Sequence, residues 1–306
     1  MPPASPDAPD EPAAPVAGPR LRLQTIALTS MAMLAFAGNS LLCREALLHT
    51  RIDPANFTLV RIAAGALALG LLVWIRDGRA GFVASLSGGS WRSALALFVY
   101  AAAFSFAYQT LTVATGALLL FGAVQATMIG YGLFKGERFG AMQVVGIVLA
   151  CGGLVYLLLP GVDAPAPSGA LLMIAAGVAW GAYSLRGRVG GDPTRATAGN
   201  FIRAVPFALL ASALALLKSS LDARGVAYAV ASGALTSGVG YAIWYTAVRD
   251  LNATSAAMVQ LSVPVITAFA GVVLLGESVT ARLVLASIAV LGGIALVIAR
   301  TGERRA

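Results

Sequence analysis

The chain has 306 residues, of which 58% are hydrophobic and only 11% are charged, and its formal net charge at pH 7 is +8. Soluble globular domains carry about 25% charged residues, so this composition excludes an ordinary soluble domain. The basic residues do not gather in one stretch that would suit a nucleic acid. They stand at the ends of long apolar blocks, which is the pattern of a protein that crosses a membrane several times.

Residues 1–19 are predicted to form a disordered tail. Seven of the fourteen prolines and three acidic residues fall there. Proline at this density prevents a helix, and the segment has too few apolar residues to form a core. It also lacks the basic start and apolar run of a signal peptide, so the first apolar block is expected to be retained.

Ten apolar blocks follow, each long enough to cross about 30 Å of hydrocarbon at about 1.5 Å per residue. The predicted spans are 23–43, 54–75, 93–112, 115–134, 140–159, 169–187, 197–217, 225–247, 252–275 and 280–299. The predicted fold class is therefore an all-α integral membrane protein with ten transmembrane helices. Most connections between the spans are short.

The distribution of lysine and arginine predicts that both termini are cytoplasmic. With the N-terminus inside, the inner segments carry fourteen of the 21 basic residues and the outer segments carry five. The remaining two, Arg61 and Arg203, lie within spans. Because short cytoplasmic loops are enriched in basic residues, we expect a multi-pass protein of a bacterial-type inner (plasma) membrane.

The two halves of the chain repeat one another. Matching pairs stand 140 positions apart, namely Gly136-Glu137 with Gly276-Glu277 and Gly152-Gly153 with Gly292-Gly293. Each half has five spans, and an odd number makes the second copy cross the membrane in the opposite sense. The predicted domains are a tail (1–19), a first five-helix repeat (20–160), a second, inverted five-helix repeat (161–300) and a short tail (301–306).

These features resemble a known family of carriers. Ten spans in two halves, an arginine in spans two and seven, and Gly-Glu before spans five and ten are similar to the drug/metabolite transporter superfamily, EamA type. The run at 115–125 further resembles the YddG-type aromatic amino-acid exporters. Proline is usual in the fourth span of that family, where Gln125 stands, whereas the second copy keeps Pro264. The resemblance covers about residues 22–300 and implies a transporter.

The spans lack the groups that a catalyst needs. All thirteen acidic residues fall in the tail, in loops or at span ends, and the single histidine, His49, lies in the first outer loop. No metal-binding or nucleophile motif occurs, so we expect no enzyme activity, no metal and no cofactor. A proton-coupled carrier generally has a titratable group at depth. The sequence therefore favours transport without proton coupling.

Four charged residues each have two interpretations. Glu137 and Glu277 follow a glycine at a helix start, where a carboxylate satisfies free N–H groups, and a role in gating is the alternative. Arg61 and Arg203 lie about 10 Å inside their spans. At this depth an arginine can extend to the headgroups or make a structural hydrogen bond. If either arginine binds a solute, a carboxylate is the natural partner.

Aromatic and polar side chains at depth are the candidates for a solute pathway. Several share one helix face, because residues three or four apart lie on the same side, and buried amides need partners in hydrocarbon. The predicted substrate-binding residues are Trp180, Tyr183, Tyr100, Phe104, Tyr108, Asn39, Gln125, Ser237, Tyr241 and Gln260. Ordinary helix packing is the alternative for each, including Trp180.

We therefore predict a carrier with a central cavity between two halves that rock against one another. The expected solute is a small metabolite, above all an aromatic or other hydrophobic amino acid, exported by alternating access without proton coupling. The alternative is an exporter of hydrophobic drugs or other small metabolites, with or without proton coupling. The expected partners are the solute and the lipid bilayer, without nucleic acid, and the chain is expected to be a monomer or a homodimer.

Overall fold

The computed structural model describes residues 19–136, 138–187, 191–215, 220–251 and 253–303, and every regular element in these ranges is a helix. The helices are α1 (Pro19–His49), α2 (Pro54–Ser87), α3 (Trp91–Ala107), α4 (Val113–Phe134), α5 (Ala141–Leu158), α6 (Pro167–Arg186), α7 (Pro193–Leu214), α8 (Ala223–Ala231), a π-helical segment (Ser232–Val239), α9 (Gly240–Ala247), a 3-10 turn (Val248–Asp250), α10 (Ala253–Gln260), α11 (Ser262–Leu275) and α12 (Ala281–Glu303). The predicted tail up to residue 18, Glu137 and residues 304–306 lie outside these ranges.

Nine helical stretches in the described ranges are long and apolar enough to cross a membrane, so the chain is a multi-pass membrane protein. The remaining predicted span, α3, is apolar but has only 17 residues. It ends at Ala107 and not at residue 112. In the turn that follows, the carbonyl oxygens of Tyr108 and Gln109 accept hydrogen bonds from Nη1 of Arg44, at 2.8 and 3.3 Å. The count of ten spans stays a prediction.

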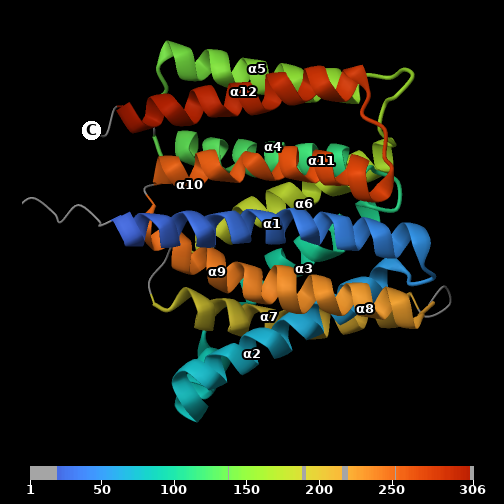
Figure 1. The fold of residues 1–306 in the computed structure, drawn as a ribbon, viewed down its shortest axis with the longest axis vertical. Helices are drawn as coiled ribbons and strands as arrows, with labels where there is room; N and C mark the ends of the chain where they lie inside the picture. Colours follow the sequence, from blue (N-terminus) through green and yellow to red (C-terminus); the bar gives the residue numbers. More distant parts are fainter. Residues whose placement is uncertain (1–18, 137, 188–190, 216–219, 252, 304–306) are drawn as a thin grey trace, which may run out of the picture.

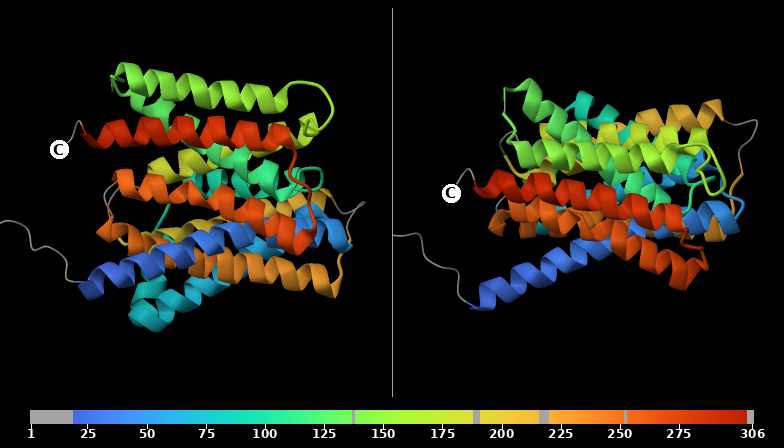
Figure 2. Two further views of the ribbon diagram at one scale, coloured as in Figure 1. Left: turned by 45° about the horizontal axis from the view of Figure 1, so that its top comes forward. Right: turned by 90° about the horizontal axis from the view of Figure 1, so that it is seen from above.

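Helices α5 and α12 lie side by side along one edge of the bundle (Figures 1 and 2). Near one end of the pair, Nε2 of Gln143 donates to the carbonyl oxygen of Val297 (3.4 Å). Near the other end, Nη1 of Arg282 donates to the carbonyl oxygen of Leu159 (2.6 Å). The start of α5 thus meets the end of α12, and the two helices run antiparallel.

Helices α2 and α7 form a second antiparallel pair. At one end, Oγ of Ser212 donates to Oδ1 of Asn56 (2.6 Å), and at the other, Nε of Arg195 donates to the carboxylate of Asp77 (2.9 Å). In both pairs one helix belongs to the first predicted half, and its partner is the corresponding helix of the second half. An inverted repeat predicts that such counterparts run in opposite directions.

Helices α2 and α7 also begin in the same way. Asp53 accepts hydrogen bonds from the N–H groups two and three residues further on, and Asp192 does the same. A proline follows each aspartate at the first helical position, where its missing N–H costs nothing. Burial raises the pKa of Asp192, but the N–H of Arg195 and the guanidinium of Arg76 lower it below its ordinary value. This cap is therefore lost only as the pH falls through that lowered pKa.

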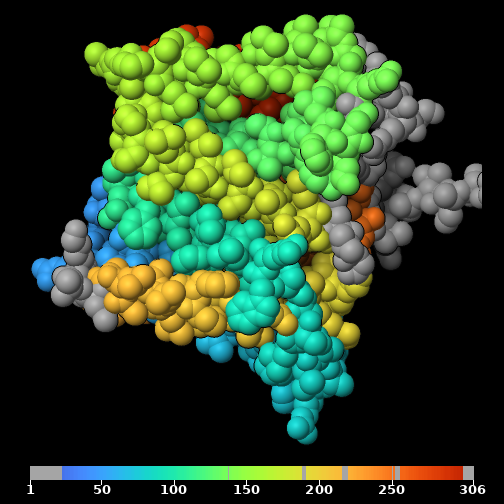
Figure 3. Space-filling view, turned by 180° about the vertical axis from the view of Figure 1, so that it is seen from behind, coloured from blue at the N-terminus to red at the C-terminus, as the bar shows by residue number. Residues whose placement is uncertain are grey.

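Both ends of the described chain lie at the same end of the bundle, as an even number of crossings requires (Figure 1). At that end α2 bends at Gly78, whose φ of 66° favours glycine. The last turns of α2 beyond the bend project from the bundle (Figures 1 and 3).

Glycines bring α5 and α12 into backbone contact. A Cβ added at Gly293 would lie 2.4 Å from the carbonyl oxygen of Gly146, and one added at Gly146 would lie 2.6 Å from that of Gly293. A Cβ added at Gly292 would meet nothing within 4 Å. The pair Gly292-Gly293 thus contains one glycine that the packing requires and one that it does not.

We expect Gly293→Ala to lower the midpoint of thermal unfolding in detergent, because overpacking a close contact costs about 1–3 kcal/mol. Gly292→Ala is the matched control and should leave the midpoint unchanged or slightly higher, since alanine favours a helix over glycine. Circular dichroism of both variants in one detergent makes the comparison. Equal midpoints would show that this contact between α5 and α12 does not stabilise the protein.

Candidate functional site

A small cavity lies between helices of both predicted halves. Its volume is about 30 Å³, and it is lined by Phe36, Asn39, Ser40, Tyr100, Phe104, Leu120, Phe121, Trp180, Thr236, Tyr241 and Gln260. These residues come from α1, α3 and α4 and from α6, the π-helical segment, α9 and α10. Counted along each half, these are the first, third and fourth predicted spans. The same three spans of each half therefore build the wall.

Trp180, on α6, is the centre of the aromatic wall. Its ring stacks on Tyr183 with 5.3 Å between the ring centroids and 25° between the ring planes. The centroids of Tyr100, on α3, and Tyr241, on α9, lie 4.9 and 5.1 Å from that of Trp180. The indole therefore fills the space between helices of the two halves.

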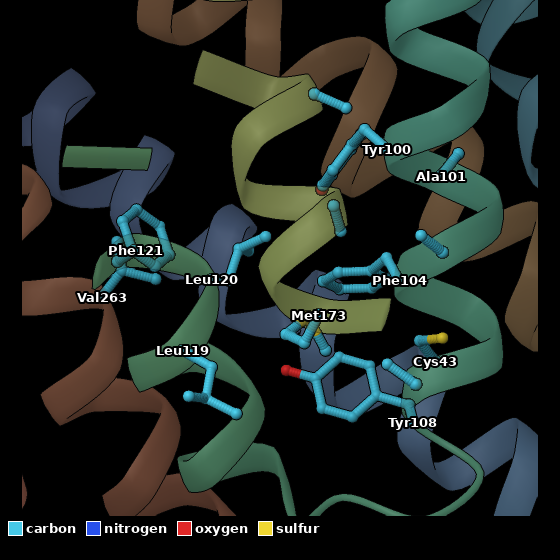
Figure 4. Packing of buried hydrophobic residues seen from close by; sticks show 14 of the residues in the cluster. Cys43, Tyr100, Ala101, Phe104, Tyr108, Leu119, Leu120, Phe121, Met173 and Val263 are labelled. Atoms are coloured by element: carbon cyan, nitrogen blue, oxygen red, sulfur yellow. The ribbon is translucent and has the colours of Figure 1, made fainter. Parts of the chain in front are cut away.

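Helix α3 and the first residue after it direct three rings, spaced four residues apart, toward α4 and α6 (Figure 4). The centroid of Phe104 lies 5.5 Å from that of Tyr100 and 4.7 Å from that of Tyr108. Tyr100 and Phe104 line the cavity. Tyr108 is fully buried beside it, and its hydroxyl donates to the carbonyl oxygen of Val113 (3.4 Å). The three rings thus form a continuous aromatic stripe from the cavity to the start of α4.

Asn39, on α1, is the polar centre of the cavity wall. Its Oδ1 accepts hydrogen bonds from Oγ of Ser232 (2.7 Å) and Oγ1 of Thr236 (3.3 Å). Its Nδ2 donates to the hydroxyl of Tyr100 (3.3 Å). One amide therefore joins α1, α3 and the π-helical segment, and it has the internal partners that a polar group at this depth requires.

Six of the ten predicted substrate-binding residues line the cavity, namely Asn39, Tyr100, Phe104, Trp180, Tyr241 and Gln260. Tyr183 lies behind the indole, and its hydroxyl accepts a hydrogen bond from Nδ2 of Asn200 (3.4 Å). Tyr108 is buried beside the cavity. Gln125 lines a separate apolar cavity between α4, α5 and α12. Figure 3 shows a hollow in the surface, with α12 visible in red at its floor. Ser237 is buried, and its hydroxyl has no hydrogen-bond partner in the described part of the chain.

The sequence reasoning did not name five lining residues: Phe36, Ser40, Leu120, Phe121 and Thr236. Phe36 lies three residues before Asn39 and four before Ser40, so helical spacing could have found both wall residues. Leu120 and Phe121 stand in a uniformly apolar run and carry no signal. Thr236 lines the cavity where Ser237 was expected. Both lie in the π-helical segment, whose wider turns change which side chains face the cavity compared with an α-helix.

An ion pair joins both halves at the end of the bundle opposite the termini. Nε of Arg44, on α1, donates to Oε1 of Glu277 (3.1 Å), which lies between α11 and α12. Oε2 of Glu277 accepts a hydrogen bond from the N–H of Val113, the first residue of α4 (2.8 Å). Glu277 therefore satisfies a free N–H group at a helix start, but at that of α4 and not of α12. We call this pair the Arg44–Glu277 latch.

The two intramembrane arginines have different surroundings. Arg203 donates to three backbone carbonyl oxygens, two of which belong to the end of α2 and the loop after it. It makes the structural hydrogen bonds that were one of the predicted alternatives. Arg61 is only 2% exposed, so it does not extend to the headgroups. Its Nη2 donates to the hydroxyl of Tyr100 (3.2 Å).

The cavity wall offers aromatic faces, hydroxyls and amides, and its described lining residues include no carboxylate. Within the described ranges, no group of three or more His, Cys, Asp or Glu side chains could hold a metal ion. The wall can therefore bury an apolar or aromatic group and make a few neutral hydrogen bonds to it.

Comparisons with known proteins agree with this architecture. The EamA-like transporter family matches residues 167–299. An uncharacterized protein of Pseudomonas aeruginosa is 55% identical over 276 residues, which cover 90% of this chain and 95% of that protein. An uncharacterized transporter of Archaeoglobus fulgidus is 27% identical over 261 residues, or 80% of this chain and 87% of the relative. The crystal structure of another protein shares the fold, with a TM-score of 0.61 and 18% sequence identity. The match covers 89% of this chain and 96% of that chain.

Proposed function

Because the chain belongs to the EamA-like transporter family, we propose that it exports small hydrophobic metabolites, above all aromatic amino acids, across a membrane. Membership of the family supports a transporter of small molecules and a role without enzyme chemistry. The observation that carries the choice of solute is the position of Trp180 among the rings of Tyr100, Tyr183 and Tyr241. Such a wall buries the ring of a solute, and its hydroxyls and amides bind the polar end.

The small volume of the cavity supports transport by alternating access. A volume of about 30 Å³ holds only a water molecule or two, whereas sites for small molecules measure about 300–1,000 Å³. A solute can enter only when the rings separate, so the described conformation is proposed to be a closed state. The antiparallel pairing of α2 with α7 and of α5 with α12 supports two inverted halves that rock against each other.

Outward transport across a bacterial-type inner membrane, with cytoplasmic termini, completes the proposal. The excess of basic residues on the segments at the terminal end supports that orientation. Both halves contribute to the wall, so the cavity can face either side without rebuilding its lining.

Counterflow tests the proposed solute. Liposomes that contain the purified protein and unlabelled phenylalanine should take up external labelled phenylalanine faster than protein-free liposomes. Tryptophan and tyrosine should compete, whereas glutamate and glucose should not. Failure of all three aromatic amino acids would overturn the proposed solute. Transport of hydrophobic dyes in the same vesicles would then favour the drug-export alternative.

We expect a pH difference to drive no uphill accumulation. Coupling to protons needs a titratable side chain that competes with the solute at depth. The residues that the structure describes in the wall of the cavity include no carboxylate or histidine. Glu277 is engaged with Arg44 and Val113 at the end of the bundle, and Glu137 lies outside the described residues. With equal phenylalanine on both sides, an imposed pH step should give no net uptake. Uptake that Glu277→Gln abolishes would contradict this expectation and identify the coupling site.

A further inference from the structure

We propose that Arg61 binds the carboxylate of the transported solute. The inference rests on the proposed transport function and narrows its substrate class to solutes that carry a carboxylate. Arg61 lies in α2, which contributes no residue to the wall of the cavity, so its side chain lies behind that wall.

Arg61 is a buried charge that has no counter-charge among the residues that the structure describes. None of the ion pairs among the described residues includes it. Its guanidinium lies over the rings of Tyr100 and Phe104, 5.3 and 5.0 Å from their centroids. Nη1 is buried and has no hydrogen-bond partner in the part of the chain that the structure describes. Because a guanidinium stays protonated at ordinary pH, an unpaired one in this place is costly and calls for an anionic partner.

The guanidinium is one side chain away from the cavity. Tyr100 and Phe104, whose rings it faces, both line the cavity. The hydroxyl of Tyr100 accepts hydrogen bonds from Nη2 of Arg61 (3.2 Å) and from Nδ2 of Asn39 (3.3 Å), which lines the cavity as well. A solute carboxylate can therefore replace this hydroxyl as the acceptor for both donors.

This replacement would also open the cavity. Tyr100 is held against Trp180, with 4.9 Å between their ring centroids. When a carboxylate takes over the bonds to Arg61 and Asn39, the ring of Tyr100 is free to leave the indole. Binding of the carboxylate end of the solute would thus make room for its apolar end, which the closed cavity lacks.

Arg203 shows how a structural arginine is satisfied at the corresponding place in the second half, 142 positions further on. It donates to the carbonyl oxygens of Gly88, Leu86 (2.6 Å) and Gly199 (3.1 Å). No described acceptor reaches Nη1 of Arg61. A purely structural role leaves this nitrogen unexplained, whereas a carboxylate forms two parallel hydrogen bonds with a guanidinium.

Two probes of the same shape test the inference. 3-Phenylpropionate carries a carboxylate and 3-phenylpropionamide a neutral amide, and both are measured as competitors of labelled phenylalanine counterflow. For the wild type we expect the acid to compete roughly tenfold more strongly or better, because hydrogen bonds to charged groups are stronger than neutral ones. Arg61→Gln should reduce this ratio to about one. The matched variant Arg203→Gln should leave the ratio unchanged.

A second readout does not depend on transport. The shift in the unfolding midpoint of the detergent-solubilised protein is measured with each probe. The acid should stabilise the wild type and Arg203→Gln more than the amide does, and it should lose this advantage in Arg61→Gln. If the glutamine variant does not fold, Arg61→Lys replaces it. It should keep part of the preference, because lysine retains the charge but lacks the fork of donors.

The possible outcomes separate the inference from the function on which it rests. Equal action of acid and amide on the wild type in both assays would overturn the role of Arg61 and leave aromatic transport intact. If Arg61→Gln still prefers the acid over the amide, the role of Arg61 is overturned as well. Stabilisation by the acid alone, lost in Arg61→Gln and without any counterflow, would support the anion site and overturn the proposed function.

Discussion

Replacing Trp180 by alanine is expected to slow phenylalanine counterflow by roughly tenfold or more when the solute is below saturation. The indole contacts the rings of Tyr100, Tyr183 and Tyr241, and the ring of the solute is proposed to take the place of one or more of these contacts. An aromatic pair contributes about 0.5–1.5 kcal/mol beyond its buried area, and about 1.4 kcal/mol is a factor of ten in binding. The apolar area lost with the indole adds to this effect.

Two variants control for the loss of an indole. Trp180→Phe keeps a ring at the site and should retain most of the transport. Trp74→Ala removes an indole that is 49% exposed on α2 and lies outside the cavity, so it should transport like the wild type. Yield and monodispersity in detergent are measured for all three. Parallel loss of monodispersity and transport in Trp180→Ala would place this residue among those that pack the core.

Removing the carboxylate of the Arg44–Glu277 latch is expected to open the end of the bundle opposite the termini. The two side chains are only 12% and 10% exposed, so water screens their interaction little. Hydrogen bonds to charged groups contribute about 1.5–3 kcal/mol, so Glu277→Ala should raise the open population roughly tenfold or more. The native thiol of Cys43, which precedes Arg44 in α1, reports the opening because it is 0% exposed.

The measurement is the rate at which a water-soluble maleimide labels Cys43. Figure 4 shows this thiol in the same cluster as Phe104 and Tyr108, so labelling requires that the cluster opens. The exposed Cys151 is first replaced by serine, to leave one thiol. Arg282→Ala is the control at the same end, because it removes a bond between α5 and α12 and leaves the latch in place. Equal labelling of Glu277→Ala and the parent would show that the latch does not hold this end closed.

The sequence by itself determined the membrane class, the helical content and the family. These follow from local properties, because a helix needs about 20 apolar residues to cross the hydrocarbon. The all-helical prediction is confirmed for the described residues, and nine of the predicted spans contain a helix of sufficient length and hydropathy. The resemblance to EamA-type transporters is confirmed by the match at residues 167–299. The YddG-type solute, the tenth span and the inverted repeat stay predictions.

Only the tertiary structure decided which candidate side chains meet. In a bilayer, lipid and neighbouring helices are both apolar, so periodicity does not distinguish a face on the cavity from a face in the packing. Tyr100, in α3, and Tyr108, directly after its end, point to the same side, yet only Tyr100 lines the cavity. A local change of helix type was equally invisible in the sequence, and it placed Thr236 at the wall.

The charged residues show the same division between sequence and structure. Arg61 and Arg203 are the same residue type at matching places in the two predicted halves, and no local pattern separates them. Two of the carbonyl groups that satisfy Arg203 lie 115 and 117 positions away, in the loop after α2 and at its end. The third lies in the helix of Arg203 itself. Glu277 binds the N–H of Val113 across 164 positions. Contacts between segments so far apart depend on how the helices pack. In the part of the chain that the structure describes, this packing left Nη1 of Arg61 without a hydrogen-bond partner.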